Sequence, residues 1–110
     1  MQIEIQARDF SLTESLEAHI KRRLLFALGT HEEHIRRVQV RLSDINGPRG
    51  GNDKQCHLHV VSGSLPDVII EDTESDMYVA IDRAADRAGR TVKRRLSRVY
   101  NQRRSVLSIE

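Results

Sequence analysis

Residues 77–99 constrain the fold most, because they combine an apolar stripe with a row of arginines. The apolar side chains recur every three or four residues, as in an amphipathic helix: Met77, Ile81, Ala84, Ala88, Val92, Leu96 and Val99. At about 100° per residue, another set falls together on a different side of the helix: Arg83, Arg87, Arg90, Arg94 and Arg98. The stripe has to be buried against a second layer, so we expect this helix to lie on a sheet with its arginines facing outward.

The limits of this helix follow from its flanking residues. Ser75 or Asp76 is a suitable N-cap, and the helix is expected to end near Val99. Gly89 is interpreted as a mild local weakness inside it. Residues 101–110 are predicted to form a flexible C-terminal tail.

Four shorter stretches predict the strands of that sheet. Residues 2–8, 37–43 and 55–61 alternate apolar with polar side chains, which is typical of half-buried strands. A fourth strand begins at residues 68–70 and runs out over residues 71–74. The glycine-rich segment 46–53 must be a loop.

A second helix is predicted between the first two strands. Apolar residues recur at helical spacing over roughly residues 12–28, from Leu12 through Leu24 and Leu25 to Leu28. Ser11 or Thr13 is a suitable cap, and Gly29 a suitable stop.

The element order is therefore β-α-β-β-β-α. The helical crossover makes the first two strands parallel, and the short connections make the following pairs antiparallel. This order predicts an α/β (α+β) two-layer sandwich, with a four-stranded mixed sheet and both helices on one face, similar to the double-stranded-RNA-binding-domain fold. The length of 110 residues suits one domain, which we place at residues 1–100.

Composition excludes several classes of protein. The chain has no apolar run long enough to span a membrane, and its first residues lack the pattern of a signal peptide. Its one cysteine, Cys56, permits no internal disulfide and is predicted to be a small buried residue. The histidines match no zinc-binding spacing, and no nucleotide-binding loop or nucleophile elbow is present. We therefore expect a cytoplasmic protein with no enzymatic activity, metal, cofactor, membrane partner or small-molecule substrate.

The basic residues are concentrated near the C-terminus. Residues 83–104 contain nine arginines or lysines against one acid, a net charge of +8, while the whole chain carries +2. Few acids lie near enough on the helix to pair with these arginines, so a polyanion-binding surface is favoured. A solvated helix face is the alternative.

The open face of the sheet is a second candidate surface. Alternation turns Arg37, Gln39 and Arg41 outward on one strand, and His57 and His59 on the next. The face lacks the aromatic residues on which an RNA-recognition motif stacks bases. Contact with RNA and simple solvation both remain open for it.

Residues 74–82, Glu-Ser-Asp-Met-Tyr-Val-Ala-Ile-Asp, resemble the ribosome hibernation-promoting factor family, also called ribosome-associated inhibitor A. The N-terminal strand and residues 35–43 are similar to that family too. The resemblance implies a bacterial, cytoplasmic translation inhibitor of the stress response that binds the small ribosomal subunit and its ribosomal RNA. It places RNA contacts on Arg83, Arg87, Arg90, Lys93, Arg94, Arg98, Arg22, Arg23, Arg37 and Arg41.

Two departures from the family pattern matter. The loop 46–54 is longer than in well-studied members, and it is a candidate finger that places Arg49 and Lys54 against a partner. The sequence ends at residue 110, which implies a short form that acts as a monomer. A general double-stranded RNA-binding module and a protein-interaction adaptor with an acidic partner are the alternative functions.

Overall fold

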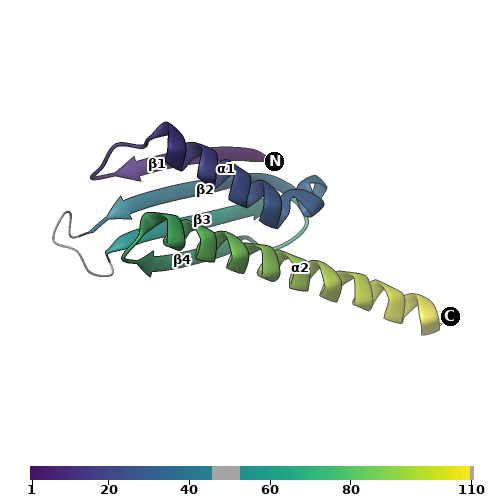
Figure 1. Cartoon of the computed structure of the whole chain (residues 1–110). Coiled ribbons are helices and arrows are strands. Elements are labelled where there is room, and N and C mark those ends of the chain that lie inside the picture. The colour runs from purple at the N-terminus through teal and green to yellow at the C-terminus, as the bar shows by residue number, and fades with distance from the viewer. Residues whose placement is uncertain (46–52, 110) are drawn as a thin grey trace.

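The structure, a computed structural model, describes residues 1–45 and 53–109, with side chains as far as Gln102. The elements in chain order are β1 (Gln2–Arg8), α1 (Glu14–Leu28), η1 (Gly29–His34), β2 (Ile35–Asp44), β3 (Lys54–Ser62), β4 (Val68–Glu74) and α2 (Met77–Ile109). Figure 1 shows both helices on the same face of one sheet, which confirms the predicted architecture.

The sheet has the strand order β1-β2-β3-β4. β1 pairs with β2 in parallel, and β2–β3 and β3–β4 are antiparallel, as predicted from the crossover and the short connections. The register places Ile5 opposite Val40, and Leu42 opposite Cys56. The apolar residues of neighbouring strands therefore share the face that the helices cover.

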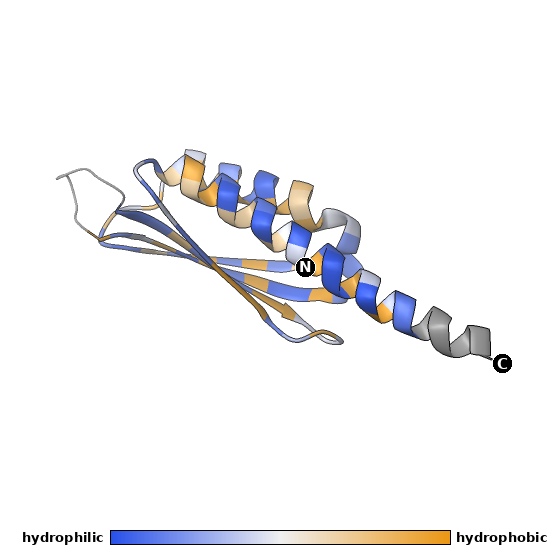
Figure 2. Ribbon diagram, turned by 90° about the horizontal axis from the view of Figure 1, so that it is seen from below, coloured by the Kyte–Doolittle hydropathy of each residue, from blue (hydrophilic) through white to orange (hydrophobic). Residues whose placement is uncertain are grey.

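The core lies between the sheet and the helices. It joins Ile20, Leu24 and Leu28 of α1 to buried side chains of the strands and to the apolar stripe of α2. Figure 2 shows the polar residues on the outer sides of the helices. The centre of the α2 stripe consists of small residues, such as Ala84 and Ala88, and both are fully buried against the rest of the core.

α1 begins with a side-chain cap. The Thr13 Oγ1 accepts a hydrogen bond from the Leu16 N–H at 3.1 Å, which selects Thr13 over Ser11. The predicted stop at Gly29 does coincide with the end of α1, but Gly29 has φ −59°, and the chain continues into η1 instead of reversing in a left-handed turn.

α2 is longer than the sequence predicts. Asp76 caps it, since the Asp76 Oδ1 accepts from the Tyr78 N–H at 2.8 Å. The helix then continues to Ile109 and does not end near Val99. No glycine or proline follows Gly89, so nothing in the sequence breaks the helix there. Figure 1 shows its C-terminal half projecting past the edge of the sheet, in a molecule with extents of 62 × 23 × 18 Å.

The segment before β3 is partly described. Residues 46–52 of the predicted loop, including Arg49, lie outside the described residues. The Asp53 side chain is buried, and the Lys54 Nζ lies 2.9 Å from the Asp44 Oδ2 and 3.3 Å from the Asp53 Oδ1. These contacts raise the pKa of Lys54, with the Asp44 hydrogen bond as the main cause. Lys54 thus links Asp44 at the end of β2 to Asp53 just before β3, and its contact with a partner stays a prediction.

No helix within residues 1–45 and 53–109 combines the length and apolar character of a membrane span.

Candidate nucleic-acid interface

The outer side of α2 carries the predicted arginine row. Arg83, Arg87, Arg90, Arg94 and Arg98 are all exposed, whereas Ala84, Ala88 and Val92 on the opposite side are buried. From Arg83 to Arg98 the row extends about 22 Å along the helix axis. The helical geometry and the amphipathic pattern together fix this arrangement.

The N-terminal half of the row has acidic partners, contrary to the sequence analysis. The Arg87 Nη1 donates to the Glu71 carbonyl oxygen at 2.7 Å and to the Asp72 Oδ2 at 3.5 Å. The Arg83 Nε lies 3.8 Å from the Glu74 Oε1. Most of these acids belong to β4, which lies beside α2 but is separate from it in sequence. These ion pairs therefore could not be predicted from the acids along the helix alone.

The acids of β4 also influence each other. A hydrogen bond with Asp72 and partial burial raise the pKa of Glu74, while the positive charge of Arg83 lowers it. Arg83 thus helps to hold two neighbouring carboxylates at the end of the strand. On α2 itself, the Arg90 Nη2 lies 2.9 Å from the Asp86 Oδ2.

The C-terminal half of the row is different. Lys93, Arg94 and Arg98 are exposed and make no ion pair with any described residue. A phosphate that approaches these groups has to displace water but no protein carboxylate. Among the predicted site residues of α2, these three are therefore the most accessible to a phosphate.

Arg95 has a structural role that the sequence did not reveal. Helical spacing alone would place it beside the row, available to a partner. Its Nη1 instead donates to the Pro66 carbonyl oxygen at 3.0 Å and to the Asp67 carbonyl oxygen at 3.1 Å. Arg95 therefore ties α2 to the turn between β3 and β4.

The two predicted arginines of α1 differ in environment. Arg22 is exposed, whereas Arg23 is half-buried with its Nε 3.2 Å from the Asp82 Oδ1 of α2. The His19 Nε2 lies 2.6 Å from the same oxygen. Arg23 therefore lies between the helices and borders the surface of α2.

The sequence analysis missed two exposed apolar residues beside Arg23. Leu25 was assigned to the apolar stripe of α1, but it is 59% exposed, and Phe26 is 79% exposed. The buried positions of α1 are Leu16, Ile20, Leu24 and Leu28, which follow each other at intervals of four. Leu25 and Phe26 fall outside that spacing, and this signal could have identified them as surface residues.

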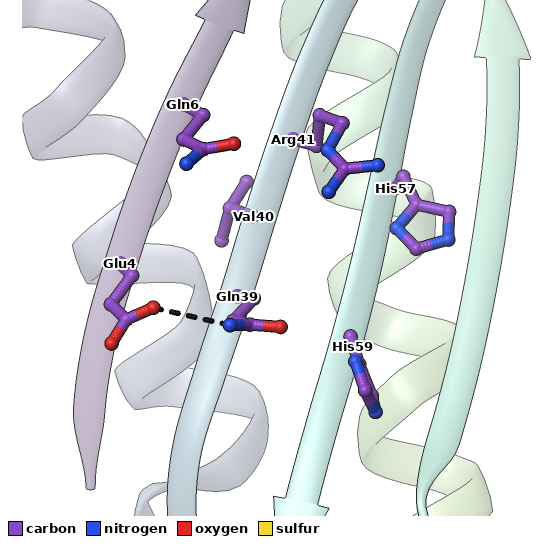
Figure 3. Close-up of a pocket in the computed structure, with 7 residues that line it drawn as sticks. All are labelled: Glu4, Gln6, Gln39, Val40, Arg41, His57 and His59. Carbon is purple, nitrogen blue, oxygen red and sulfur yellow. Dashed lines mark hydrogen bonds between the residues drawn. The ribbon is translucent and has the colours of Figure 1, made fainter.

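The open face of the sheet carries the predicted strand residues (Figure 3). Arg41, Gln39, His57 and His59 share a shallow pocket with Glu4 and Gln6 of β1. The His59 Nε2 lies 2.8 Å from the Asp67 Oδ2, and the Gln39 Nε2 donates to the Glu4 Oε2 at 3.3 Å. Polar contacts within the protein thus occupy part of this face.

The predicted site residues therefore lie on two separate surfaces. Arg37 and Arg41 alternate with the buried residues of β2 and so belong to the face of the sheet that the helices leave open, whereas the α2 row lies on the exposed side of a helix. Figures 1 and 2 show both helices on the other face of the sheet. The structure brings the α2 residues together and places Arg23 beside them. It does not place Arg37 or Arg41 on the same surface.

Cys56 is buried, as the alternation of β3 predicted. Burial is the main cause that raises the pKa of its thiol to about 12, and the negative charge of Asp72 adds to it. Such a thiol is protonated at neutral pH and is a poor nucleophile or metal ligand. Within the described part of the chain, no three His, Cys, Asp or Glu side chains cluster as metal ligands would.

A mixed four-stranded sheet, two helices on one face and an outward arginine row define a small α/β protein with a basic helical surface. The chain belongs to the family of sigma 54 modulation proteins and S30EA ribosomal proteins, whose model matches residues 3–100. This match confirms the family resemblance inferred from residues 74–82.

Solved structures show the same fold. The N-terminal domain of Protein Y from Thermus thermophilus superimposes with a TM-score of 0.70 at 25% identity, over 86% of this chain and 98% of that domain. A ribosomal subunit interface protein from Coxiella burnetii gives a TM-score of 0.69 at 14% identity, over 86% of this chain and 96% of that one. No curated protein matches the sequence significantly.

Proposed function

We propose that this protein is a ribosome-associated translation inhibitor, a hibernation factor that binds the small ribosomal subunit through ribosomal RNA. The observation that carries the proposal is the outward arginine row of α2, in a chain that belongs to a family of ribosomal proteins. The protein acts in the cytoplasm, as a monomer and without catalysis. Its effect on translation follows from occupying a site that the translating ribosome needs.

Arginine suits this task because its planar guanidinium donates two parallel hydrogen bonds to a phosphate. A straight row about 22 Å long reaches several phosphates at once. Lys93, Arg94 and Arg98 meet phosphates directly, since no described side chain neutralises them. Binding to RNA requires three arginines to give up a contact with a protein oxygen for one with a phosphate oxygen: Arg83, Arg87 and Arg90. These three therefore contribute less binding energy per residue.

The first test is co-sedimentation of the purified protein with ribosomes on a sucrose gradient, beside a variant with Arg94→Glu and Arg98→Glu. We expect the wild type to travel with small subunits and the variant to remain at the top. The matched control compares the single variants Arg94→Glu and Arg36→Glu, which make the same change in net charge, since Arg36 is an exposed strand residue outside the α2 row. Equal loss of binding in both variants would show a general charge effect and would contradict an interface on α2.

The contribution of the sheet is measured with Arg37→Glu and Arg41→Glu. We expect a smaller loss than for the α2 variant, because the polar groups around Arg41 already contact each other. A larger loss would move the main interface to the open face of the sheet.

The alternative functions give different results in the same assay. A general double-stranded RNA-binding module would bind a naked duplex as tightly as it binds ribosomes. A protein-interaction adaptor would form a native complex that survives ribonuclease. We expect retention on the small subunit, weak binding to duplex, and loss of the complex after ribonuclease.

A further inference from the structure

The two helices touch at Gly89. A Cβ atom built on Gly89 would lie 2.8 Å from the Ala27 carbonyl oxygen of α1. This close approach leaves a shallow groove between the helices on their outer side, lined by Phe26 and Arg23 of α1 and by Arg90 and Lys93 of α2. Figures 1 and 2 show α1 and α2 side by side above the sheet, so this groove adjoins the arginine row.

Phe26 is the unusual residue in this groove. It is the most exposed of the large apolar side chains among the described residues, at 79%. The core of α1 is complete without it, because Leu16, Ile20, Leu24 and Leu28 form the buried side of the helix. Phe26 therefore does not support the fold, and aromatic side chains of this kind are enriched at binding interfaces.

One cation contacts the ring, and two more line the groove. The Arg23 Cζ lies 5.6 Å from the centroid of Phe26, within the range of a cation–π contact. Arg90 and Lys93 line the same groove, and Asp86 is the one acid that lines it. Asp86 pairs with Arg90 at 2.9 Å, and Asp82 of α2 pairs with Arg23 at 3.2 Å. Lys93 makes no ion pair with any described residue, so the groove keeps a net positive charge.

We propose that this groove holds one unpaired nucleotide of ribosomal RNA, whose base stacks on Phe26 while Lys93 and Arg23 contact its flanking phosphates. This inference rests on the proposed function and adds a contact to the base of the RNA. Aromatic side chains beside arginines and lysines are the usual means of binding a splayed-out base. A docking site for an apolar protein segment would have few charges at its centre, and lysine is depleted there.

The test compares substitutions of Phe26 by their affinity for purified small subunits. Phe26→Ala and Phe26→Leu both remove the π face, whereas Phe26→Trp keeps it. Stacking of one base on an aromatic residue corresponds to about 5- to 150-fold in affinity. We expect a loss in this range for alanine and leucine, and an affinity within about twofold of wild type for tryptophan.

Leu25→Ala is the matched control, because it removes an exposed apolar side chain next to Phe26. We expect it to bind like the wild type. All four variants should keep the thermal unfolding midpoint of the wild type, since neither side chain is part of the buried core. The salt dependence of Phe26→Ala should match the wild type, because stacking neutralises no phosphate.

The outcomes separate this inference from the proposed function. Full affinity of Phe26→Ala, together with loss of binding by the Arg94→Glu and Arg98→Glu variant, would overturn the stacking site alone. Full affinity of Phe26→Leu with loss in Phe26→Ala would show apolar docking on a protein and would also overturn it. A wild type that does not bind small subunits would overturn the proposed function.

Discussion

Gly89 has a role that its sequence context hides. An alanine there would be favoured by about 1 kcal/mol from helix propensity alone. Its Cβ would, however, lie 2.8 Å from the backbone carbonyl oxygen of Ala27, which cannot move without shifting α1. Overpacking of this kind costs about 1–3 kcal/mol, so the steric term outweighs propensity.

We therefore expect Gly89→Ala to lower the free energy of unfolding by up to about 2 kcal/mol, as measured by urea denaturation. Ser97→Ala is the control, because Ser97 is an exposed residue of the same helix. It should leave the stability unchanged or raise it by about 0.5 kcal/mol through helix propensity. A stabilised Gly89→Ala variant would show that the two helices do not touch at this point.

At the scale of the elements, the start of α1 depends on one hydrogen bond. The Thr13 Oγ1 accepts from the Leu16 N–H, one of the donors that the first turn of a helix leaves without a partner. We expect Thr13→Ala to destabilise the protein by about 1 kcal/mol and to lower the unfolding midpoint by about 4–8 °C.

The matched control for this prediction is Ser11→Ala, because the sequence alone suggests Ser11 and Thr13 equally as the cap of α1. Ser11 is exposed and lies before the helix begins, so its substitution should leave the midpoint within about 1 °C of wild type. Equal effects of the two substitutions would contradict the cap that the structure assigns to α1.

The elements also show which features the sequence determines locally. The two-residue alternation of β1 and the four-residue spacing of Leu16 to Leu28 depend only on local geometry, so the strands, the helices and the outward arginine row were predicted correctly. The length of α2 was underestimated, because its end was placed at the last apolar residue of the stripe, although no residue there breaks a helix.

Contacts between elements could not be predicted in this way. The pairing of Arg87 with Asp72, the link from Arg95 to the β3–β4 turn and the contact of Gly89 with α1 all join residues that are separate in sequence. Spacing along one helix contains no information about them. The groove around Phe26 depends on the same contacts, so its lining residues emerge only in the folded molecule.

The whole molecule is elongated, with a radius of gyration of 16.0 Å. A compact domain of this length would have a radius of about 13 Å. The excess reflects α2, whose C-terminal part extends past the edge of the sheet (Figure 1). A long, straight and positively charged helix on a small folded base is suited to lie along RNA.

Binding through such a surface must depend steeply on salt, because each neutralised phosphate releases a counterion. If the α2 row and Lys93 contact about six phosphates, the logarithm of the affinity for small subunits should fall against the logarithm of salt concentration with a slope of about −4 to −5. The Arg94→Glu and Arg98→Glu variant should show a slope shallower by about 2, whereas Arg36→Glu should keep the wild-type slope. Fluorescence titrations at several salt concentrations measure the slopes of the wild type and of each variant. A wild-type affinity that does not change with salt would exclude RNA phosphates as the main contacts of α2.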